Sequence, residues 1–120
     1  MVKEGQRSKQ IIKIHPKKIS EITEGKYDKF MIKFGASYCG PCKELSLFLD
    51  KSGLDLKADV PVYIVQLDED QNEIAESLSE FFEFNSIPYC VVSDKSLTIL
   101  DEVLGFDKKT LTSFIERNFK

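Results

Sequence analysis

Two cysteines separated by two residues are the clearest chemical signal in this sequence of 120 residues. They lie in the run Cys39-Gly40-Pro41-Cys42. A cysteine attacks a disulfide only as its thiolate, so the surroundings of the attacking sulfur must stabilise negative charge. Pro41 favours a helix that begins here, because proline is well tolerated in a first turn. The unpaired N–H groups and the positive end of that helix would stabilise the Cys39 thiolate.

The spacing of the pair also indicates how the two sulfurs share the reaction. Cys42 lies one helical turn after Cys39, so its sulfur can return to the first one. Gly40 permits the tight turn between them, and Pro41 stiffens it. We therefore predict that Cys39 forms a mixed disulfide with the substrate and that Cys42 resolves it.

Zinc is the main alternative use of two cysteines at this spacing. A structural zinc site normally has four ligands, and outside the pair the chain has only Cys90 and His15. We therefore expect no metal and no other cofactor, and the strand–turn–helix setting disfavours an inert pair. Cys90 is predicted to be a small buried side chain, with a third reactive thiol as the alternative. His15 is predicted to be a loop or helix-edge residue.

The bulk composition excludes several classes of function. The chain carries 17 basic and 20 acidic side chains, a net charge of −3, which disfavours binding to a nucleic-acid backbone. We find no apolar run long enough to span a membrane and no secretory signal. Together with an odd number of cysteines, this predicts a cytoplasmic location instead of a secreted disulfide framework. A monomer is the expectation for this size.

The elements that must position the pair follow from the spacing of apolar residues. Short apolar or β-branched runs predict five strands, at residues 11–14, 30–34, 62–67, 89–92 and 99–104. The second of these is almost continuously apolar, which is typical of a strand buried on both faces. The stretch before the third strand, residues 54–61, is predicted to be an irregular connector.

Helical spacing predicts four helices. The first covers residues 16–23, starting at its proline, and the second covers residues 41–51. A capping box of Asp70 and Glu73 begins the third, and Asp107 is the predicted N-cap of the fourth. The apolar stripes of these helices are, in order, Ile19 and Ile22; Leu45, Phe48 and Leu49; Ile74, Leu78, Phe81 and Phe82; and Leu111, Phe114, Ile115 and Phe119.

The resulting order, β-α-β-α-β-α-β-β-α, indicates an α/β fold. Parallel strands need helical crossovers, whereas the last two strands are close enough in sequence for a hairpin. We therefore predict a central mixed sheet of about five strands with helices on both faces. The whole chain, residues 1–120, is expected to form one domain, with residues 1–10 as a flexible polar segment.

Several motifs resemble those of one known family. Residues 37–43, Ser-Tyr-Cys-Gly-Pro-Cys-Lys, resemble the active-site signature of the thioredoxin family. Residues 86–89, Ser-Ile-Pro-Tyr, resemble that family's Ile–cis-Pro motif. Residues 104–105 are similar to its Val-Gly, and residues 68–72 to its Asp-rich turn. The resemblance extends from Ile11 over nearly the whole chain.

The resemblance implies a thioredoxin fold and a thiol–disulfide oxidoreductase that reduces protein disulfides. Its partners would be those proteins and an electron donor such as a thioredoxin reductase. A cis peptide bond would precede Pro88, and a substrate chain would pair as an added strand near Ile87. The residues implied for substrate docking are Gly40, Pro41, Ile87, Pro88, Tyr89 and Gly105.

Two positions beside the pair depart from the family pattern. Tyr38 replaces a Trp and keeps an aromatic ring next to Cys39. Lys33 replaces a buried Asp that is thought to accept the proton of the second thiol. Either the Lys33 stem packs and its amine extends to water, or its ammonium lies beneath the thiols. In the second case it would stabilise thiolate and make the protein more oxidising, or, if neutral, act as a base for Cys42.

These departures leave a second function open. A thioredoxin fold does not by itself fix an activity. The chain could be an adaptor, or a redox-sensing partner of one dedicated protein, without general reductase activity. Turnover by a thioredoxin reductase would distinguish the two functions.

Overall fold

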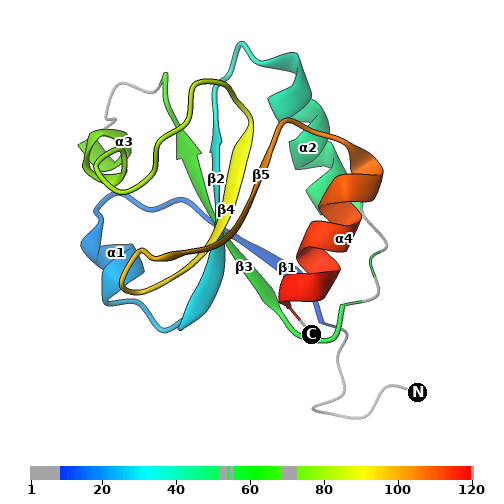
Figure 1. The fold of residues 1–120 in the computed structure, drawn as a ribbon, viewed down its shortest axis with the longest axis horizontal. Coiled ribbons are helices and arrows are strands. Elements are labelled where there is room, and N and C mark those ends of the chain that lie inside the picture. Colours follow the sequence, from blue (N-terminus) through cyan, green and yellow to red (C-terminus); the bar gives the residue numbers. More distant parts are fainter. Residues whose placement is uncertain (1–8, 52–53, 55, 69–72, 120) are drawn as a thin grey trace.

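The computed structural model describes residues 9–51, 54, 56–68 and 73–119. In chain order its elements are β1 (Ile11–Ile14), α1 (Ser20–Thr23), β2 (Lys29–Gly35), α2 (Gly40–Lys51), β3 (Val60–Gln66), α3 (Glu73–Leu78), β4 (Tyr89–Asp94), β5 (Ile99–Leu104) and α4 (Lys108–Asn118). This is the predicted order of strands and helices (Figure 1). Most of the predicted N-terminal segment, residues 1–8, and Asp70 of the predicted capping box lie outside the described residues.

The five strands form one mixed sheet in the order β1-β3-β2-β4-β5. β1 and β2 both run parallel to β3, whereas β4 runs antiparallel to β2 and to β5. β2 therefore has hydrogen-bonded neighbours on both sides, and all its residues after Lys29 are buried. This confirms the prediction of a strand buried on both faces. It also anchors the end of β2, from which the loop to the cysteines starts.

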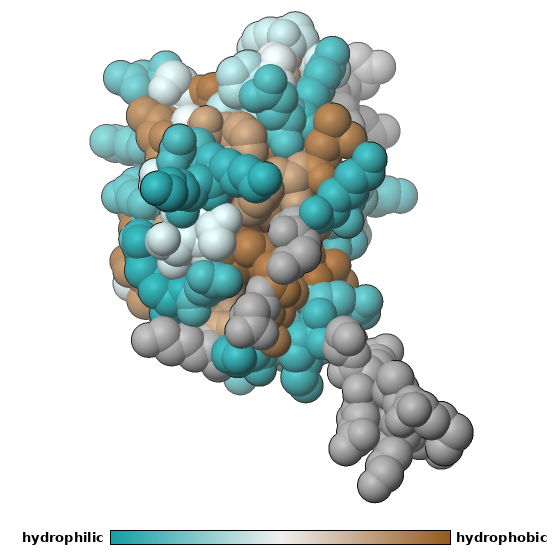
Figure 2. All heavy atoms as spheres, turned by 90° about the vertical axis from the view of Figure 1, so that its right-hand side faces the viewer, coloured by the Kyte–Doolittle hydropathy of each residue, from teal (hydrophilic) through white to brown (hydrophobic). Residues whose placement is uncertain are grey.

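Helices cover both faces of the sheet, as predicted. α1 and α3 lie on one face, and α2 and α4 lie on the other (Figure 1). Because successive side chains of a strand point to opposite faces, Phe30 and Phe34 pack toward α1 and α3, and Met31 packs toward α2 and α4. Figure 2 shows the surface of the molecule from the side of α2 and α4. On this surface, hydrophobic residues are visible between hydrophilic ones.

The predicted apolar stripes of the two longer helices are buried. These side chains are Leu45, Phe48 and Leu49 of α2 and Leu111, Phe114 and Ile115 of α4. Asp107 is the N-cap of α4, as predicted: its carboxylate accepts the backbone N–H of Thr110 at 2.9 Å. Within the part of the chain that the structure describes, no helix is long and apolar enough to cross a membrane.

Two elements begin at other residues than predicted. α1 begins at Ser20, four residues after the proline, because the Glu21 carboxylate accepts the N–H groups of Lys17 and Lys18 and holds a turn ahead of the helix. β3 begins at Val60, inside the predicted connector. Its first N–H donates to the carbonyl of residue 10 and so joins it to β1.

The end of α3 also differs from the prediction. α3 ends at Leu78, whose carbonyl accepts the N–H groups of both Phe81 and Phe82 in the turn that follows. This turn leaves Phe81 47% exposed, whereas Phe82 is buried. Phe81 therefore does not belong to the apolar stripe, and the assignment of both phenylalanines to the helix was wrong.

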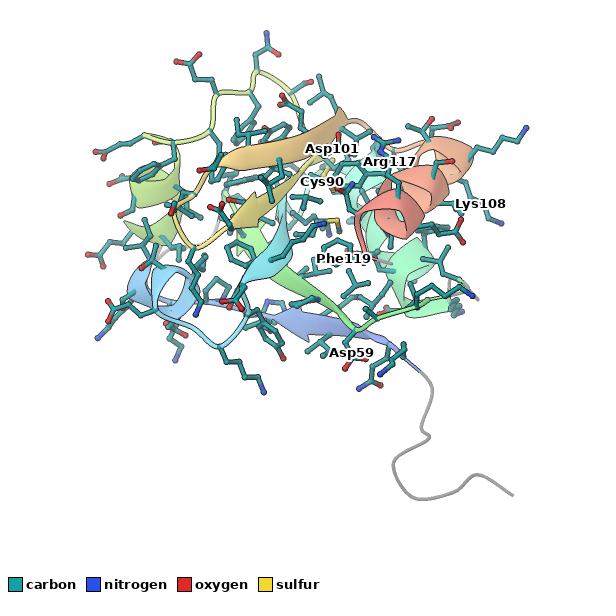
Figure 3. The ribbon with its side chains drawn as sticks, turned by 60° about the horizontal axis from the view of Figure 1, so that its bottom comes forward. Asp59, Cys90, Asp101, Lys108, Arg117 and Phe119 are labelled. Atoms are coloured by element: carbon teal, nitrogen blue, oxygen red, sulfur yellow. A yellow bond between two sulfur atoms is a disulfide. The ribbon has the colours of Figure 1, made fainter. Side chains whose placement is uncertain are left out.

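The Asp101 carboxylate links β5 to α4 (Figure 3). One of its oxygens accepts hydrogen bonds from Arg117 Nε and Asn118 Nδ2, each at 2.8 Å. The bond from Arg117 is the main reason that the pKa of Asp101 falls to about 2. A carboxyl with a lowered folded-state pKa stabilises the fold above its unfolded pKa, about 3.9, and loses that effect as the pH falls through the folded value.

We expect Asp101→Asn to lower the free energy of unfolding at pH 7 by about 0.5–1 kcal/mol, the range of a partly exposed ion pair. The loss should shrink as the pH approaches 2, where about half of the wild-type Asp101 carboxyls are themselves protonated. Urea unfolding at both pH values measures this difference. Asp28→Asn is the control, because its side chain is 97% exposed and its oxygen lies 3.5 Å from Lys95 Nζ. An equal loss at both pH values would contradict the prediction.

Candidate active site

The loop after β2 places Cys39 directly before the first residue of α2. The Cys39 carbonyl accepts the N–H of Lys43 at 3.2 Å, and the Cys39 sulfur accepts the N–H of Cys42 at 3.1 Å. Cys39 thus occupies the N-cap position, with its sulfur in the place of a capping oxygen. Pro41 lies in the first turn, where a missing N–H removes no helical hydrogen bond. A negative charge on Cys39 would face backbone N–H groups and the positive helix end.

The two sulfurs of the pair are joined in a disulfide. The Cα atoms of Cys39 and Cys42 are 5.2 Å apart, a separation that one turn of α2 produces. Both residues are nearly buried, with 8% and 3% of their surface exposed. The pair therefore meets the geometric requirement of a disulfide within a single helical turn.

Contacts from the turn after β3 hold the loop that leads to Cys39. The Asp68 carboxylate accepts the backbone N–H of Ser37 at 3.1 Å and also the Ser37 hydroxyl. These bonds lower the pKa of Asp68. The N–H of Cys39 donates to the carbonyl of Ala36 at 3.2 Å, which closes the turn.

The start of β4 brings three of the implied docking residues together. The Ile87–Pro88 peptide bond is cis, and the Ile87 side chain packs against Cys39 and Cys42. The carbonyl of Pro88 accepts the N–H of Gly105 at 2.7 Å. Gly105 has φ +81°, a left-handed conformation that favours glycine.

The two tyrosines selected from the sequence lie in different surroundings. Tyr38, directly before Cys39, is 76% exposed. Tyr89 is buried on the α1 and α3 face of the sheet, where its ring stacks on Phe84 and its hydroxyl donates to Glu102 at 2.8 Å. The structure therefore does not bring the Tyr89 ring to the cysteine pair.

Lys33 lies against Ser46 of α2, one helical turn after Cys42, and is almost completely buried. Only 2% of its surface is exposed, and its amine donates a hydrogen bond to the hydroxyl of Ser46. Burial is the main cause that lowers the pKa of Lys33. The interpretation in which its amine extends to water was wrong, because α2 packs over this part of β2.

A cavity of about 330 Å³ adjoins both Lys33 and Cys42. Its lining residues are His15, Lys33, Ala36, Ser37, Cys42, Lys43, Ser46, Ile64 and Gln66. His15 and Lys43 are exposed, so the cavity opens to solvent on their side. Cys39 does not line it.

Cys90 is completely buried, as predicted for a small core side chain (Figure 3). It lies opposite Lys33 in the pairing of β4 with β2, and burial raises the pKa of its thiol to about 12. A thiol held neutral in this way is a poor nucleophile. Among the described residues, no group of three or more His, Cys, Asp or Glu side chains could hold a metal ion.

Two contacts of the site were not predicted from the sequence, the one between Lys33 and Ser46 and the one between Ser37 and Asp68. Ser46 follows Cys42 by four residues, so helical spacing alone could have placed both side chains on one face of α2. The bond between Ser37 and Asp68 spans 31 positions and leaves no local signal in the sequence.

The comparison with known proteins decides the family. The chain matches the family model for Thioredoxin over residues 10–117. It belongs to the thioredoxin family. A thioredoxin of Staphylococcus saprophyticus is 35% identical over 89 residues, which are 73% of this chain and 80% of that protein. A protein disulfide-isomerase of Medicago sativa is 30% identical over 88 residues, which are 73% of this chain and 17% of that protein.

The fold is that of solved thioredoxins. The crystal structure of oxidized thioredoxin O2 from Arabidopsis thaliana matches with a TM-score of 0.65 at 23% identity, covering 92% of this chain and 96% of that one. The predicted thioredoxin fold is thus confirmed. Membership of the family and the cysteine pair at the start of α2 identify this domain as a thiol–disulfide oxidoreductase.

Proposed function

We propose that the chain reduces disulfides in other proteins by dithiol exchange. The Cys39 thiolate attacks one sulfur of the substrate disulfide, and the other substrate sulfur leaves as a thiolate. The Cys42 thiolate then attacks the Cys39 sulfur and releases the second substrate thiolate. The substrate gains two electrons, and Cys39 and Cys42 end as a disulfide. The observation that carries this proposal is the Cys39 sulfur at the N-cap, accepting the N–H of its own partner, Cys42, at 3.1 Å.

The substrate would dock on the surface around the exposed edge of Cys39. Ile87 packs against the pair, and Pro88 and Gly105 are joined by a backbone hydrogen bond beside it. An extended substrate chain can add to the backbone near Ile87 as a further strand. Gly40, Pro41 and the exposed ring of Tyr38 complete the surface from the side of α2. Tyr89 contributes through its backbone, since its ring is buried on the other face.

The oxidised pair must be reduced again after each turnover. A protein such as a thioredoxin reductase is one donor, and a reducing compartment such as the cytoplasm is the setting in which the cycle would run. The chain would act as a monomer.

Reduction of insulin disulfides by the wild-type chain tests the proposal. With dithiothreitol as reductant, the chain should accelerate the precipitation of insulin well above the rate with dithiothreitol alone. Replacing dithiothreitol by NADPH and a thioredoxin reductase should sustain the same turnover. No acceleration in either assay would reject the proposal in favour of a thioredoxin-fold adaptor or redox sensor.

Lys33 is the residue through which this chain would set its reduction potential. Lys33 lines the same cavity as Cys42, and a positive charge there would stabilise the Cys42 thiolate and hence the reduced pair. We expect Lys33→Met to lower the potential by about 30 mV, the equivalent of a tenfold change for a two-electron couple. Equilibration with glutathione measures it. Lys29→Met removes the same charge from the exposed start of β2 and should change nothing. Equal reduction potentials for the wild type, Lys33→Met and Lys29→Met would show that Lys33 does not influence the cysteine pair.

A further inference from the structure

Residues 36–38 connect β2 to Cys39 and form one side of the proposed docking surface. Ser37 and Tyr38 are both exposed, and 76% of the Tyr38 surface is accessible to solvent. Among the described residues, neither a hydrogen bond nor a ring contact holds the Tyr38 side chain. The position of this ring therefore depends on the backbone of its two neighbours.

The N–H groups on either side of Tyr38 have acceptors of different kinds. The N–H of Cys39 donates to the carbonyl of Ala36 at 3.2 Å, which closes a turn within the segment. The N–H of Ser37 donates to Asp68 Oδ1 at 3.1 Å, and the Ser37 hydroxyl donates to Oδ2 of the same carboxylate. This second link connects the segment to the turn after β3, 31 positions along the chain.

The Asp68 carboxylate is well suited to hold an exposed segment. Both of its oxygens accept hydrogen bonds from Ser37, and these bonds are the main cause that lowers the pKa of Asp68, so the group is ionised at neutral pH. A charged acceptor forms a stronger hydrogen bond than a neutral one. The link can therefore persist although water has access to both residues.

We propose that Asp68 is a positioning residue for protein substrates: its carboxylate fixes Ser37, and thereby Tyr38, where a substrate chain docks beside Cys39. The proposal rests on the reduction of protein disulfides proposed above and adds a residue that acts on docking. Asp68 has no part in the exchange itself, because the Cys39 sulfur has its own contact with the N–H of Cys42 at the start of α2.

The proposal distinguishes protein disulfides from small ones. A protein must dock against the segment around Tyr38 before Cys39 can attack it, so a displaced segment should slow its reduction. A small disulfide needs only a reactive Cys39, and the start of α2 supplies that reactivity. 2-Hydroxyethyl disulfide is a suitable probe because it is neutral, so a lost charge at residue 68 neither attracts nor repels it.

Single-turnover reactions of the reduced full chain with insulin and with 2-hydroxyethyl disulfide measure the two rate constants. We expect Asp68→Ala to lower the rate constant with insulin about tenfold, the equivalent of one hydrogen bond to a charged group. The rate constant with 2-hydroxyethyl disulfide should not change. An unchanged rate constant with insulin, or an equal loss with both disulfides, would overturn the proposal.

Asp59→Ala is the matched control. Asp59 lies at the other end of β3 (Figure 3), and its carboxylate also accepts a backbone N–H at 3.1 Å, that of Gln10. The variant loses the same charge and the same kind of bond at a distance from the cysteines, so both rate constants should equal those of the wild type. Urea unfolding establishes that both variants are folded. An equal loss with insulin in Asp59→Ala would contradict the proposal, since net charge would then explain it.

Two further variants separate the bonds of Asp68 from its charge. Asp68→Asn removes the charge but keeps an oxygen that can accept the N–H of Ser37, so it should recover most of the rate with insulin. Ser37→Ala removes the hydroxyl bond, and it should add little to the loss in Asp68→Ala because both changes break the same link. An Asn variant as slow as the Ala variant, or losses that add fully, would overturn the proposal.

The role of Tyr38 is tested in the same way. Tyr38→Ala should slow the reaction with insulin, and combining it with Asp68→Ala should add little, because the ring is no longer held in place. Full additivity would show that Asp68 does not act through Tyr38 and would contradict the proposal.

The wild-type chain separates this inference from the proposed function. If the wild type and Asp68→Ala reduce insulin equally well, the inference fails and the proposed function stands. If the wild type reduces 2-hydroxyethyl disulfide but not insulin, the proposed function fails, and this inference fails with it.

Discussion

Cys39→Ser is expected to abolish the reduction of insulin disulfides, leaving only the rate of the reductant alone. The hydroxyl of serine does not attack disulfides, because its proton is not lost at neutral pH and no disulfide exchange begins. Serine is also a favoured N-cap, so its oxygen can accept the N–H of Cys42 and preserve the start of α2. The loss of activity would therefore report the missing nucleophile and not a damaged helix.

Cys90→Ala is the matched control for this experiment. Cys90 is completely buried and its thiol pKa is raised to about 12, so it has no part in the exchange. The variant loses one sulfur from the core, which costs some stability, but it should reduce insulin as the wild type does. Circular dichroism and urea unfolding establish that both variants are folded. Wild-type activity in Cys39→Ser would reverse the roles that we assign to the two cysteines.

Cys42→Ser is expected to stop the cycle after the first exchange and to accumulate a mixed disulfide between Cys39 and the substrate. Cys39 keeps its sulfur, its N-cap position and the N–H of residue 42, so it can still attack. Without the second thiolate, the bond to the substrate has no internal nucleophile to break it. Turnover should fall to background while a stable adduct forms in a one-to-one ratio.

Mass spectrometry under non-reducing conditions measures this adduct. Because the first exchange only adds the chain to a substrate whose two halves stay joined by its other disulfides, the mass should equal that of the chain plus one substrate molecule. Dithiothreitol should separate the two. The double variant Cys39→Ser, Cys42→Ser is the control, because it retains only Cys90 and should form no adduct. An adduct on Cys90, or none in Cys42→Ser, would refute the assignment of Cys39 as the nucleophile.

The elements of the fold could largely be predicted from the sequence because their signals are local. The β-branched and apolar runs produce the strands, and spacings of three and four residues produce the buried faces of α2 and α4. Cys39, Pro41 and Cys42 could be selected for the same reason. One turn of helix relates the two sulfurs, and a proline in the first turn marks where the helix begins.

Tertiary packing decided what local spacing does not contain. A lysine in an apolar strand can be exposed or buried, and only the packing of α2 over β2 places Lys33 against Ser46 and into the cavity with Cys42. Phe81 continues a helical spacing, but the turn after Leu78 directs it to solvent. Whether a side chain is desolvated depends on residues distant in sequence, and that same desolvation determines its charge. The sequence by itself therefore indicated which two sulfur atoms would react. The tertiary structure determined the burial and the charges around them.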